Sequence, residues 1–358
     1  MIAGLAGFAG EVVRWQQVHG RNGLPWQGST DPYTVWLSEI MLQQTQVSVV
    51  LEYFPRFMQR FPDVAALAAA TQDDVMSLWS GLGYYSRARH LHRCAQEVVA
   101  VHGGRFPGTA VELASLPGIG RSTAAAIASF CFGERAAILD GNVKRVLTRV
   151  LGFGKDLACA ANERELWGHA EALLPARAAA GSMPAYTQGL MDLGATVCMT
   201  RNPQCLLCPV NSVCAARRHG TPQDYPVKTR KLKRTAQSLW LLRAHSAEGA
   251  VWLERRPARG IWAGLYCLPV FESRSDLAAA LPENQRAGLT DDASFLHVLT
   301  HKDLHLHPVG AELRTSDLRG QGAGEWFDAA QWPALGLPAP IRRLLSPSRG
   351  PARGGASG

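Results

Sequence analysis

Apolar residues recur at helical spacing through residues 1–222, in segments that glycine and proline interrupt. The same stretch contains no sustained alternation of apolar and polar positions, the pattern that indicates half-buried strands. We therefore predict a mostly α-helical region here. The clearest predicted helices cover Tyr33–Met58, Asp73–Leu78, Tyr85–His102, Val111–Leu116, Ser122–Phe132, Asn142–Leu151 and Asn162–Leu174.

The pattern changes at residues 223–235, a Pro-containing stretch that is rich in Lys and Arg and has no acidic residue after Asp224. We interpret it as a basic linker, and both a solvated charge run and a contact with phosphate fit its composition. Residues 236–345 are predicted to form a separate α+β domain, and residues 346–358 a disordered tail. Predicted strands lie in Ser238–Arg243, Ala250–Glu254 and Tyr266–Phe271, and helical patches in Ser275–Leu281 and Pro340–Leu345.

Composition and charge narrow the class of protein. The 358-residue chain is 47% hydrophobic, as ordinary globular proteins are, and it is long enough for two cores. Its formal net charge of +8 suits a polyanion such as nucleic acid. No charged segment followed by a long apolar run opens the chain. We therefore expect a cytoplasmic protein that associates with DNA and not with a membrane.

Half of the eight cysteines crowd into one short segment with the spacing C-x6-C-x2-C-x5-C. Thiolates in such a run match either a tetrahedral zinc ion or a [4Fe–4S] cluster. A zinc ribbon usually has two separate C-x2-C pairs, whereas one pair occurs here, so the spacing favours the cluster and leaves zinc as the alternative. These residues are Cys198, Cys205, Cys208 and Cys214.

A Pro- and Gly-containing turn at Leu116–Gly120 separates two helical patterns. Gly118 and Gly120 are expected to permit positive φ there, and the next helix is expected to begin at about Arg121. The first N–H groups of that helix could bind a phosphate. The segment therefore indicates a helix-hairpin-helix that contacts the DNA backbone, although alone it would fit any turn between helices.

Two acidic residues differ from their surroundings. Glu39 is the only charged residue between Asp31 and Glu52. Desolvation there would raise its pKa and suit it to protonate a leaving base, although an exposed helix position is the alternative explanation. Asp140 precedes a predicted helix, where it could cap the N-terminus, stabilise a sugar cation, or do both.

The segments Leu116–Ala124 and Ile138–Val143, together with the clustered cysteines, resemble the helix-hairpin-helix/Gly-Pro-Asp superfamily of DNA glycosylases. Three more segments, Trp36–Thr45, Gly81–Tyr85 and Gly260–Tyr266, resemble its MutY branch, which removes adenine opposite 8-oxoguanine. The resemblance covers nearly the whole chain except the tail. It implies a six-helix barrel with an iron–sulfur helical module, followed by an α+β Nudix-like domain that inspects 8-oxoguanine.

The resemblance also implies roles for individual residues. Glu39 matches the acid that protonates N7 of the flipped adenine, and Asp140 matches the carboxylate that stabilises C1′ of the sugar. The clustered cysteines match the ligands of a structural [4Fe–4S] cluster. Gln44 and Tyr84 match side chains that fill the duplex beside the lesion. The residues that match contacts with DNA or its bases are Leu42, Gln43, Gln44, Tyr84, Gly118, Gly120, Ser122, Asn142, Lys144, Arg201, Thr300 and His301.

One position separates the chain from similar enzymes that also cut the DNA backbone. Endonuclease III-type enzymes carry a lysine where this chain has Ser122, and a hydroxyl cannot form the Schiff base that cleavage requires. We therefore expect a monofunctional glycosylase, with Lys144 as a phosphate contact or an adventitious trap for the abasic aldehyde. The alternatives are a bifunctional lyase, which Ser122 argues against, and a non-catalytic iron–sulfur DNA-binding module, which the two acids argue against.

The C-terminal domain departs from true Nudix hydrolases. After Pro269 it lacks the R-E-x-x-E-E cluster that holds magnesium, so no pyrophosphohydrolase activity is expected. The Phe-Ser-His loop of the MutY branch corresponds to Leu299–His301, in which Thr300 keeps a hydroxyl for the lesion and His301 is retained. The expected partner is double-stranded DNA with adenine opposite 8-oxoguanine or guanine, bound by a monomer.

Overall fold

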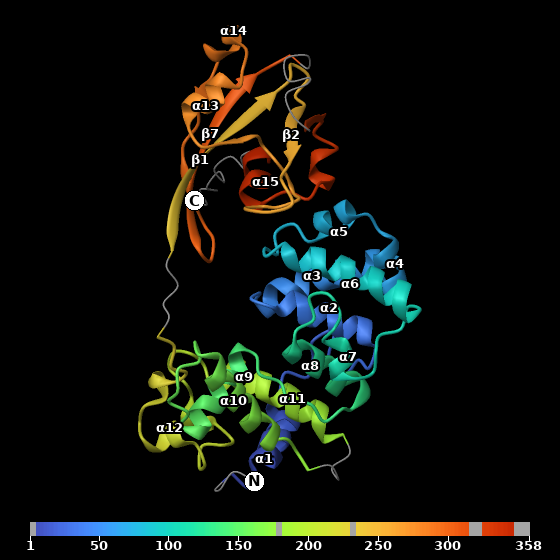
Figure 1. The fold of residues 1–358 in the computed structure, drawn as a ribbon, viewed down its shortest axis with the longest axis vertical. Coiled ribbons are helices and arrows are strands. Elements are labelled where there is room, and N and C mark those ends of the chain that lie inside the picture. Colours follow the sequence, from blue (N-terminus) through green and yellow to red (C-terminus); the bar gives the residue numbers. More distant parts are fainter. Residues whose placement is uncertain (1–4, 177–180, 230–233, 315–323, 347–358) are drawn as a thin grey trace, which may run out of the picture. The chain divides into compact units, whose positions relative to one another are not determined.

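The computed structural model of the chain describes residues 5–176, 181–229, 234–314 and 324–346. It divides into two compact units (Figure 1). We call residues 1–69 and 90–231 the helical unit, and residues 70–89 and 232–358 the sheet unit. The sheet unit thus includes a segment from the N-terminal half, which the sequence did not predict. Residues 230–233 of the predicted linker and 347–358 of the predicted tail lie outside the described residues.

The helical unit forms as its apolar spacing predicts. Helix α1 packs on α11, and α9 packs on α10, α11 and α12 (Figure 1). Their shared core includes Phe8, Val12, Leu147 and Leu190, each at most 2% exposed. The helices are α1 (Phe8–His19), α2 (Pro32–Leu42), α3 (Val47–Arg60), α4 (Val64–Ala69), α6 (Ser86–His102, which begins in the sheet unit), α7 (Ala110–Leu113), α8 (Arg121–Phe132), α9 (Gly141–Leu151), α10 (Ala160–Ala172), α11 (Ser182–Asp192) and α12 (Ala215–Arg218), with short turns η1 (Leu193–Val197), η2 (Cys205–Leu207) and η3 (Pro222–Asp224).

The prediction of one continuous helix over Tyr33–Met58 is wrong. The chain leaves helical geometry after α2 and starts α3 at Val47. Gln44 adopts a φ of +57°, in the left-handed region that helices exclude. The break coincides with four polar residues, Gln43 to Gln46, that interrupt the apolar pattern.

The sheet unit has an eight-stranded mixed sheet in the order β3-β2-β1-β7-β5, with β4 on β1, β6 on β7 and β8 on β2. Long strands β1 and β7 run parallel, in register from Thr235 opposite Lys302 to His245 opposite Glu312. The strands are β1 (Thr235–His245), β2 (Val251–Arg255), β3 (Tyr266–Cys267), β4 (Val270–Phe271), β5 (Thr290–Asp291), β6 (Phe295–Val298), β7 (Lys302–Glu312) and β8 (Gly324–Phe327); the helices are α5 (Gln72–Leu78), α13 (Arg274–Ala279), α14 (Glu283–Arg286), η4 (Trp332–Ala334) and α15 (Ala339–Leu345).

Helix α13 covers β1 and β4, and Figure 1 shows it beside the long strands. Leu277 of α13 packs with Leu242, Trp252 and Val309 of the sheet in one core. The predicted strand over Tyr266–Phe271 is two short strands, because β3 pairs with β2 whereas β4 pairs with β1. Within the described residues, every helix is too short or too polar to span a bilayer.

Candidate active site

Glu39 lies near the C-terminal end of α2, where Trp36 and Leu37 are fully buried. These apolar neighbours remove water from its carboxyl. Burial therefore raises the pKa of Glu39 to about 8, and the negative charge of Asp140 adds to the shift. At neutral pH Glu39 carries a proton that it can donate.

Asp140 caps the N-terminus of α9, as predicted: its Oδ1 accepts a hydrogen bond from the N–H of Val143 at 2.7 Å. Burial raises the pKa of Asp140. The N–H groups of Val143 and Asn142 and the positive charges of Arg145 and Lys144 act in the opposite direction, because they favour the carboxylate. The two acids thus sit in different electrostatic surroundings, which suits one to donate a proton and the other to carry a negative charge.

Both acids line one cavity of the helical unit, with a volume of about 1240 Å³. Typical ligand pockets measure about 300–1,000 Å³, so a flipped nucleobase and its sugar would fit. Several sequence-predicted contacts lie in the same wall. They are Leu42, Gln43, Gln44, Ser122 and Asn142.

The break between α2 and α3 forms one edge of this cavity. Gln43 Nε2 donates to Thr123 Oγ1 at 3.4 Å, which links the break to α8. Gln44 is exposed and keeps its left-handed backbone. A non-glycine residue held in this conformation often marks a functional site.

The predicted hairpin is present, and α8 begins at Arg121 as expected. Gly118 has a φ of +77°, and a Cβ atom there would lie 2.6 Å from Cβ of His90, so only glycine fits. The expectation of positive φ at Gly120 is wrong: its φ is −84°, and it caps α8 in an extended conformation. Neither glycine lines the cavity.

Ser122 and Lys144 occupy different surroundings. Ser122 Oγ accepts a hydrogen bond from the N–H of Leu139 at 3.0 Å, which ties α8 to the residue before Asp140. Lys144 Nζ forms an ion pair with Glu163 on α10 at 2.6 Å and does not line the cavity. Lys144 therefore stays out of the cavity wall, although its positive charge is close enough to favour the Asp140 carboxylate.

Arg145 is a cavity residue that the sequence analysis missed. It donates to Asn142 Oδ1 at 2.8 Å, to the carbonyl of Gly194 at 2.6 Å and to the carbonyl of Cys198 at 2.7 Å. It thereby joins the helix that follows Asp140 to the first of the clustered cysteines. The sequence could indicate only the contact with Asn142, which lies three residues away on the same helix. The other partners, Gly194 and Cys198, lie far away in the sequence.

A second group of missed residues surrounds Asp192 at the end of α11. Its side chain is completely buried, and it accepts hydrogen bonds from Arg21 Nε at 2.7 Å and Gln188 Nε2 at 2.9 Å. Arg21 and Gln188 also line the cavity. Asp192 could have been found in the sequence in the same way as Glu39, because it is a single acidic residue within an apolar helical segment.

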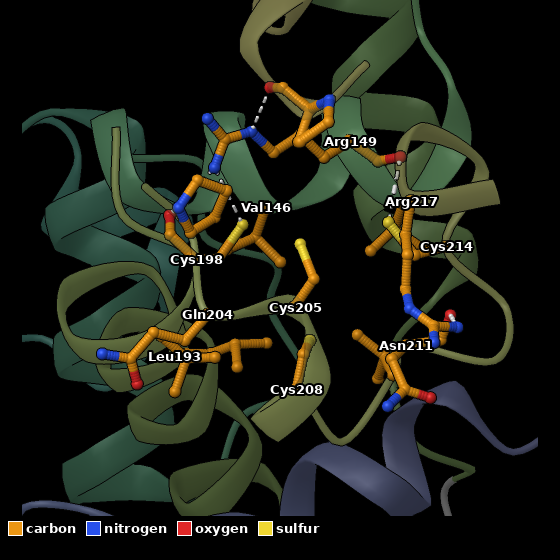
Figure 2. A pocket seen from close by; sticks show the side chains of 15 residues that line it. Val146, Arg149, Leu193, Cys198, Gln204, Cys205, Cys208, Asn211, Cys214 and Arg217 are labelled. Carbon is orange, nitrogen blue, oxygen red and sulfur yellow. Dashed lines mark hydrogen bonds between the residues drawn. The ribbon is translucent and has the colours of Figure 1, made fainter. Parts of the chain in front are cut away.

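The clustered cysteines line a second, smaller cavity, and Figure 2 shows their side chains around a common space. Arg149, only 2% exposed, donates to Cys198 Sγ at 3.3 Å and to the carbonyl of Met199 at 2.7 Å. In the part of the chain that the structure describes, no group of three or more His, Cys, Asp or Glu side chains is arranged to hold a single metal ion. Arg201, in the loop between the first two of these cysteines, is exposed.

Two other predicted residues meet in the sheet unit. Tyr84 Oη and Thr300 Oγ1 lie 2.7 Å apart in a hydrogen bond. Tyr84 is 40% exposed and has a left-handed φ of +47°. Thr300 and the exposed His301 form the tip of the hairpin between β6 and β7.

Residues 70–89 are fixed to the rest of the sheet unit by several polar contacts. The hydroxyls of Ser80 and Tyr85 donate to the carbonyl of Leu337 at 2.8 and 3.2 Å, and Arg89 donates to the carbonyl of Ala263 at 2.8 Å. Arg342 Nε adds a hydrogen bond to Ser80 Oγ at 3.2 Å. These contacts bring Tyr84 to the Thr300 hairpin.

Comparison with known proteins assigns the family. The HhH-GPD superfamily of base excision DNA repair proteins matches residues 37–169, and the NUDIX domain matches residues 239–347. Over 342 residues the chain is 35% identical to the adenine DNA glycosylase of Buchnera aphidicola subsp. Acyrthosiphon pisum, an alignment that covers 94% of this chain and 96% of that protein. The chain belongs to the adenine DNA glycosylase family.

Other similarities agree. The glycosylase is 43% identical over 226 residues to human adenine DNA glycosylase, which covers 60% of this chain and 40% of the human protein. A thermostable thymine-DNA glycosylase matches 60% of this chain and 97% of its own, at 26% identity and a TM-score of 0.53. An endonuclease III–DNA complex, at 20% identity and a TM-score of 0.51, matches 62% of this chain and 99% of its own and shares the fold.

The predicted fold class is therefore confirmed: a helical glycosylase region and a C-terminal Nudix-like domain. The protein is an enzyme of base excision repair that hydrolyses the N-glycosyl bond of adenine in DNA.

Proposed function

We propose that the glycosylase is monofunctional and removes adenine paired with 8-oxoguanine or guanine after flipping the base into the cavity of the helical unit. The pair of acids in that cavity carries the proposal, because burial raises the pKa of Glu39 to about 8, whereas Asp140, whose pKa burial also raises, is bound by the N–H groups of α9 and faces the positive charges of Arg145 and Lys144. Flipping separates adenine from its duplex, which costs a few kcal/mol. A mismatched base lowers that cost.

Each acid has one task in bond breaking. Glu39 gives its proton to N7 of adenine, so the electrons of the C1′–N9 bond leave with a neutral base. Asp140 lies where its negative charge can stabilise the oxocarbenium-like sugar. Water then adds to C1′, and its proton passes to the Glu39 carboxylate, which restores the acid.

Among the described residues that line the cavity there is no lysine, so the proposed reaction leaves the DNA backbone intact. Ser122 lines the cavity, and Lys144 is paired with Glu163 outside the lining. A Schiff base with the abasic sugar needs a free amine. The product is therefore an abasic site.

The clustered cysteines fit a [4Fe–4S] cluster better than zinc. Their side chains lie around a common space, as Figure 2 shows, and the single C-x2-C pair in their spacing favours a cluster over a zinc ribbon. Cys198, Cys205, Cys208 and Cys214 would hold the cluster, which would cross-link the loops that carry them. Arg145 and Arg149 position the Cys198 segment by binding its carbonyl groups and sulfur.

Recognition of the opposite base is assigned to the hydroxyls of Tyr84 and Thr300. Each is accessible, and each can exchange its present partner for a polar edge of 8-oxoguanine. Leu42 and Gln44 support the base pair from the cavity edge, and the hairpin at Gly118 and Gly120, Arg201 and Lys144 contact the backbone. His301 lies next to Thr300 and adds a further polar contact.

A strand-cleavage assay tests the proposal. The substrate is a labelled duplex with one adenine opposite 8-oxoguanine, and half of each reaction is treated with hot alkali. Cleavage only after alkali, and none with adenine opposite thymine, is the expected result. Cleavage without alkali would show lyase chemistry, and tight binding without base loss would show a non-catalytic binding protein.

A further inference from the structure

Arg87, in the first turn of α6, has no role in the proposed chemistry, yet it is only 7% exposed. Its guanidinium carbon lies 5.2 Å from the ring centre of Trp79 and 5.5 Å from the ring centre of Tyr84. These distances are within the range of cation–π attraction. Arg87 therefore binds the aromatic side chain that meets Thr300.

The same guanidinium also binds the backbone on which Tyr84 is mounted. Its Nη2 donates to the carbonyl of Leu82 at 3.3 Å and to that of Gly83 at 3.2 Å. The Gly83 carbonyl also accepts a hydrogen bond from Trp79 Nε1 at 3.1 Å. Arg87 and Trp79 thus both donate hydrogen bonds to the Gly83 carbonyl of this turn.

This turn needs such support. Gly83 and Tyr84 are both left-handed, with φ of +74° and +47°. A tyrosine avoids this region unless its surroundings impose it. Arg87 contacts one ring and two carbonyl groups of the turn at once, which suits a planar cation with several donors.

We propose that Arg87 is a positioning residue for lesion recognition, which holds the Gly81–Tyr84 turn so that Tyr84 is presented beside Thr300. The inference rests on the proposed role of Tyr84 at the base opposite adenine. Burial lowers the pKa of Arg87 to about 10, which leaves the side chain cationic at neutral pH. Arg87 is not among the residues that line the adenine cavity.

The test uses the full-length protein with Arg87→Met, which keeps an unbranched apolar stem but loses the charge and the donors, and Arg87→Lys, which keeps a charge but loses the planar guanidinium. Arg93→Met is the matched control, because Arg93 lies on the same helix and is exposed. Hydrogen exchange of the amides in residues 81–85 is measured by mass spectrometry. We expect about tenfold faster exchange in Arg87→Met, a smaller increase in Arg87→Lys and none in Arg93→Met.

Single-turnover rates are then compared for adenine opposite 8-oxoguanine and opposite guanine. The ratio of the two rates should fall about tenfold in Arg87→Met, and Arg87→Met should add nothing when Tyr84 is already alanine. Unchanged exchange at residues 81–85, an equal rate loss on both substrates, or full additivity with Tyr84→Ala would overturn the inference. Faster exchange with an unchanged ratio, in Arg87→Met and in Tyr84→Ala alike, would support the positioning of Tyr84 but reject its proposed role at the lesion.

Discussion

Polar groups are buried in the adenine cavity of the helical unit but exposed in the Tyr84–Thr300 pair of the sheet unit. In the cavity, burial raises the pKa of Glu39 to about 8 and so keeps a proton ready for transfer. Tyr84 and Thr300 are exposed hydroxyls that bind each other. Bond breaking benefits from desolvated charge, because electrostatic stabilisation is stronger away from water. Recognition benefits from accessible hydroxyls, because they exchange hydrogen-bond partners at little net cost.

The difference predicts two kinds of variant. Substitutions of the acids should slow base removal from every adenine mispair by the same factor. Substitutions at the exposed hydroxyls should change the preference between 8-oxoguanine and guanine and leave the chemistry of the favoured substrate nearly intact.

The largest effect is expected from Glu39→Gln, which keeps the shape of the protonated side chain but cannot release a proton. Loss of a general acid should lower the single-turnover rate by about 10²- to 10⁴-fold on both mispairs. Affinity for a duplex with a non-hydrolysable adenosine analogue serves as the control and should be unchanged. A loss confined to one mispair would contradict the division between the two regions.

Asp140→Asn should have the next largest effect. It removes the negative charge, and the rate should fall by about 10²- to 10³-fold on both substrates. Asparagine is as good an N-cap as aspartate, so the free energy of unfolding should stay nearly constant, whereas Asp140→Ala should lose about 1 kcal/mol as well. Equal destabilisation in the two variants would assign the rate loss to folding.

The pH dependence of the rate should follow the proton on Glu39. Above about pH 8 the folded enzyme loses it, and the rate should fall about tenfold per pH unit on both substrates. Burial holds the pKa of Glu39 above its ordinary value of 4.5, so between about pH 4.5 and pH 8 the folded state binds more protons than the unfolded state. The contribution of Glu39 to stability therefore decreases as pH rises through this window, and Glu39→Gln should abolish that part of the decrease in chemical denaturation.

Thr300→Val should change only the preference for 8-oxoguanine over guanine as the base opposite adenine. Removal of one exposed hydrogen bond should reduce the ratio of rates, 8-oxoguanine over guanine, by about three- to tenfold. Thr300→Ser keeps the hydroxyl and provides the matched control. If valine slowed both substrates equally, the hydroxyl would have no part in discrimination.

The smallest effect is expected from Lys144→Ala. Its ion pair with Glu163 is 22% and 37% exposed, and such pairs contribute about 0.2–1 kcal/mol to the free energy of unfolding. Glu163→Gln should cost a similar amount. Strand cleavage without alkali should be equally low with and without Lys144, and a clear fall on its removal would make Lys144 the source of lyase chemistry.

Structural features that depend on neighbouring residues in the chain could be predicted from the sequence. Glu39 was recognisable because no charge lies near it, and Gly118 because a turn between helices requires it. Arg145 was missed because its partners Gly194 and Cys198 lie about fifty residues later, and periodicity carries no information on such pairs. The break at Gln44 was missed because the apolar spacing continues on both sides of it.

Residues 70–89 also depend on contacts with residues far away in the sequence, and these contacts can form only late in the synthesis of the chain. Ser80 and Tyr85 bond to Leu337, which follows them by 257 and 252 residues, and Gly336 lies against buried Met76. At about 5–20 residues per second, a ribosome needs roughly ten to fifty seconds to synthesise the intervening chain. Throughout that interval the segment lacks these partners, so a nascent chain that stops before Gly336 presents the apolar surface around Met76 to chaperones and proteases.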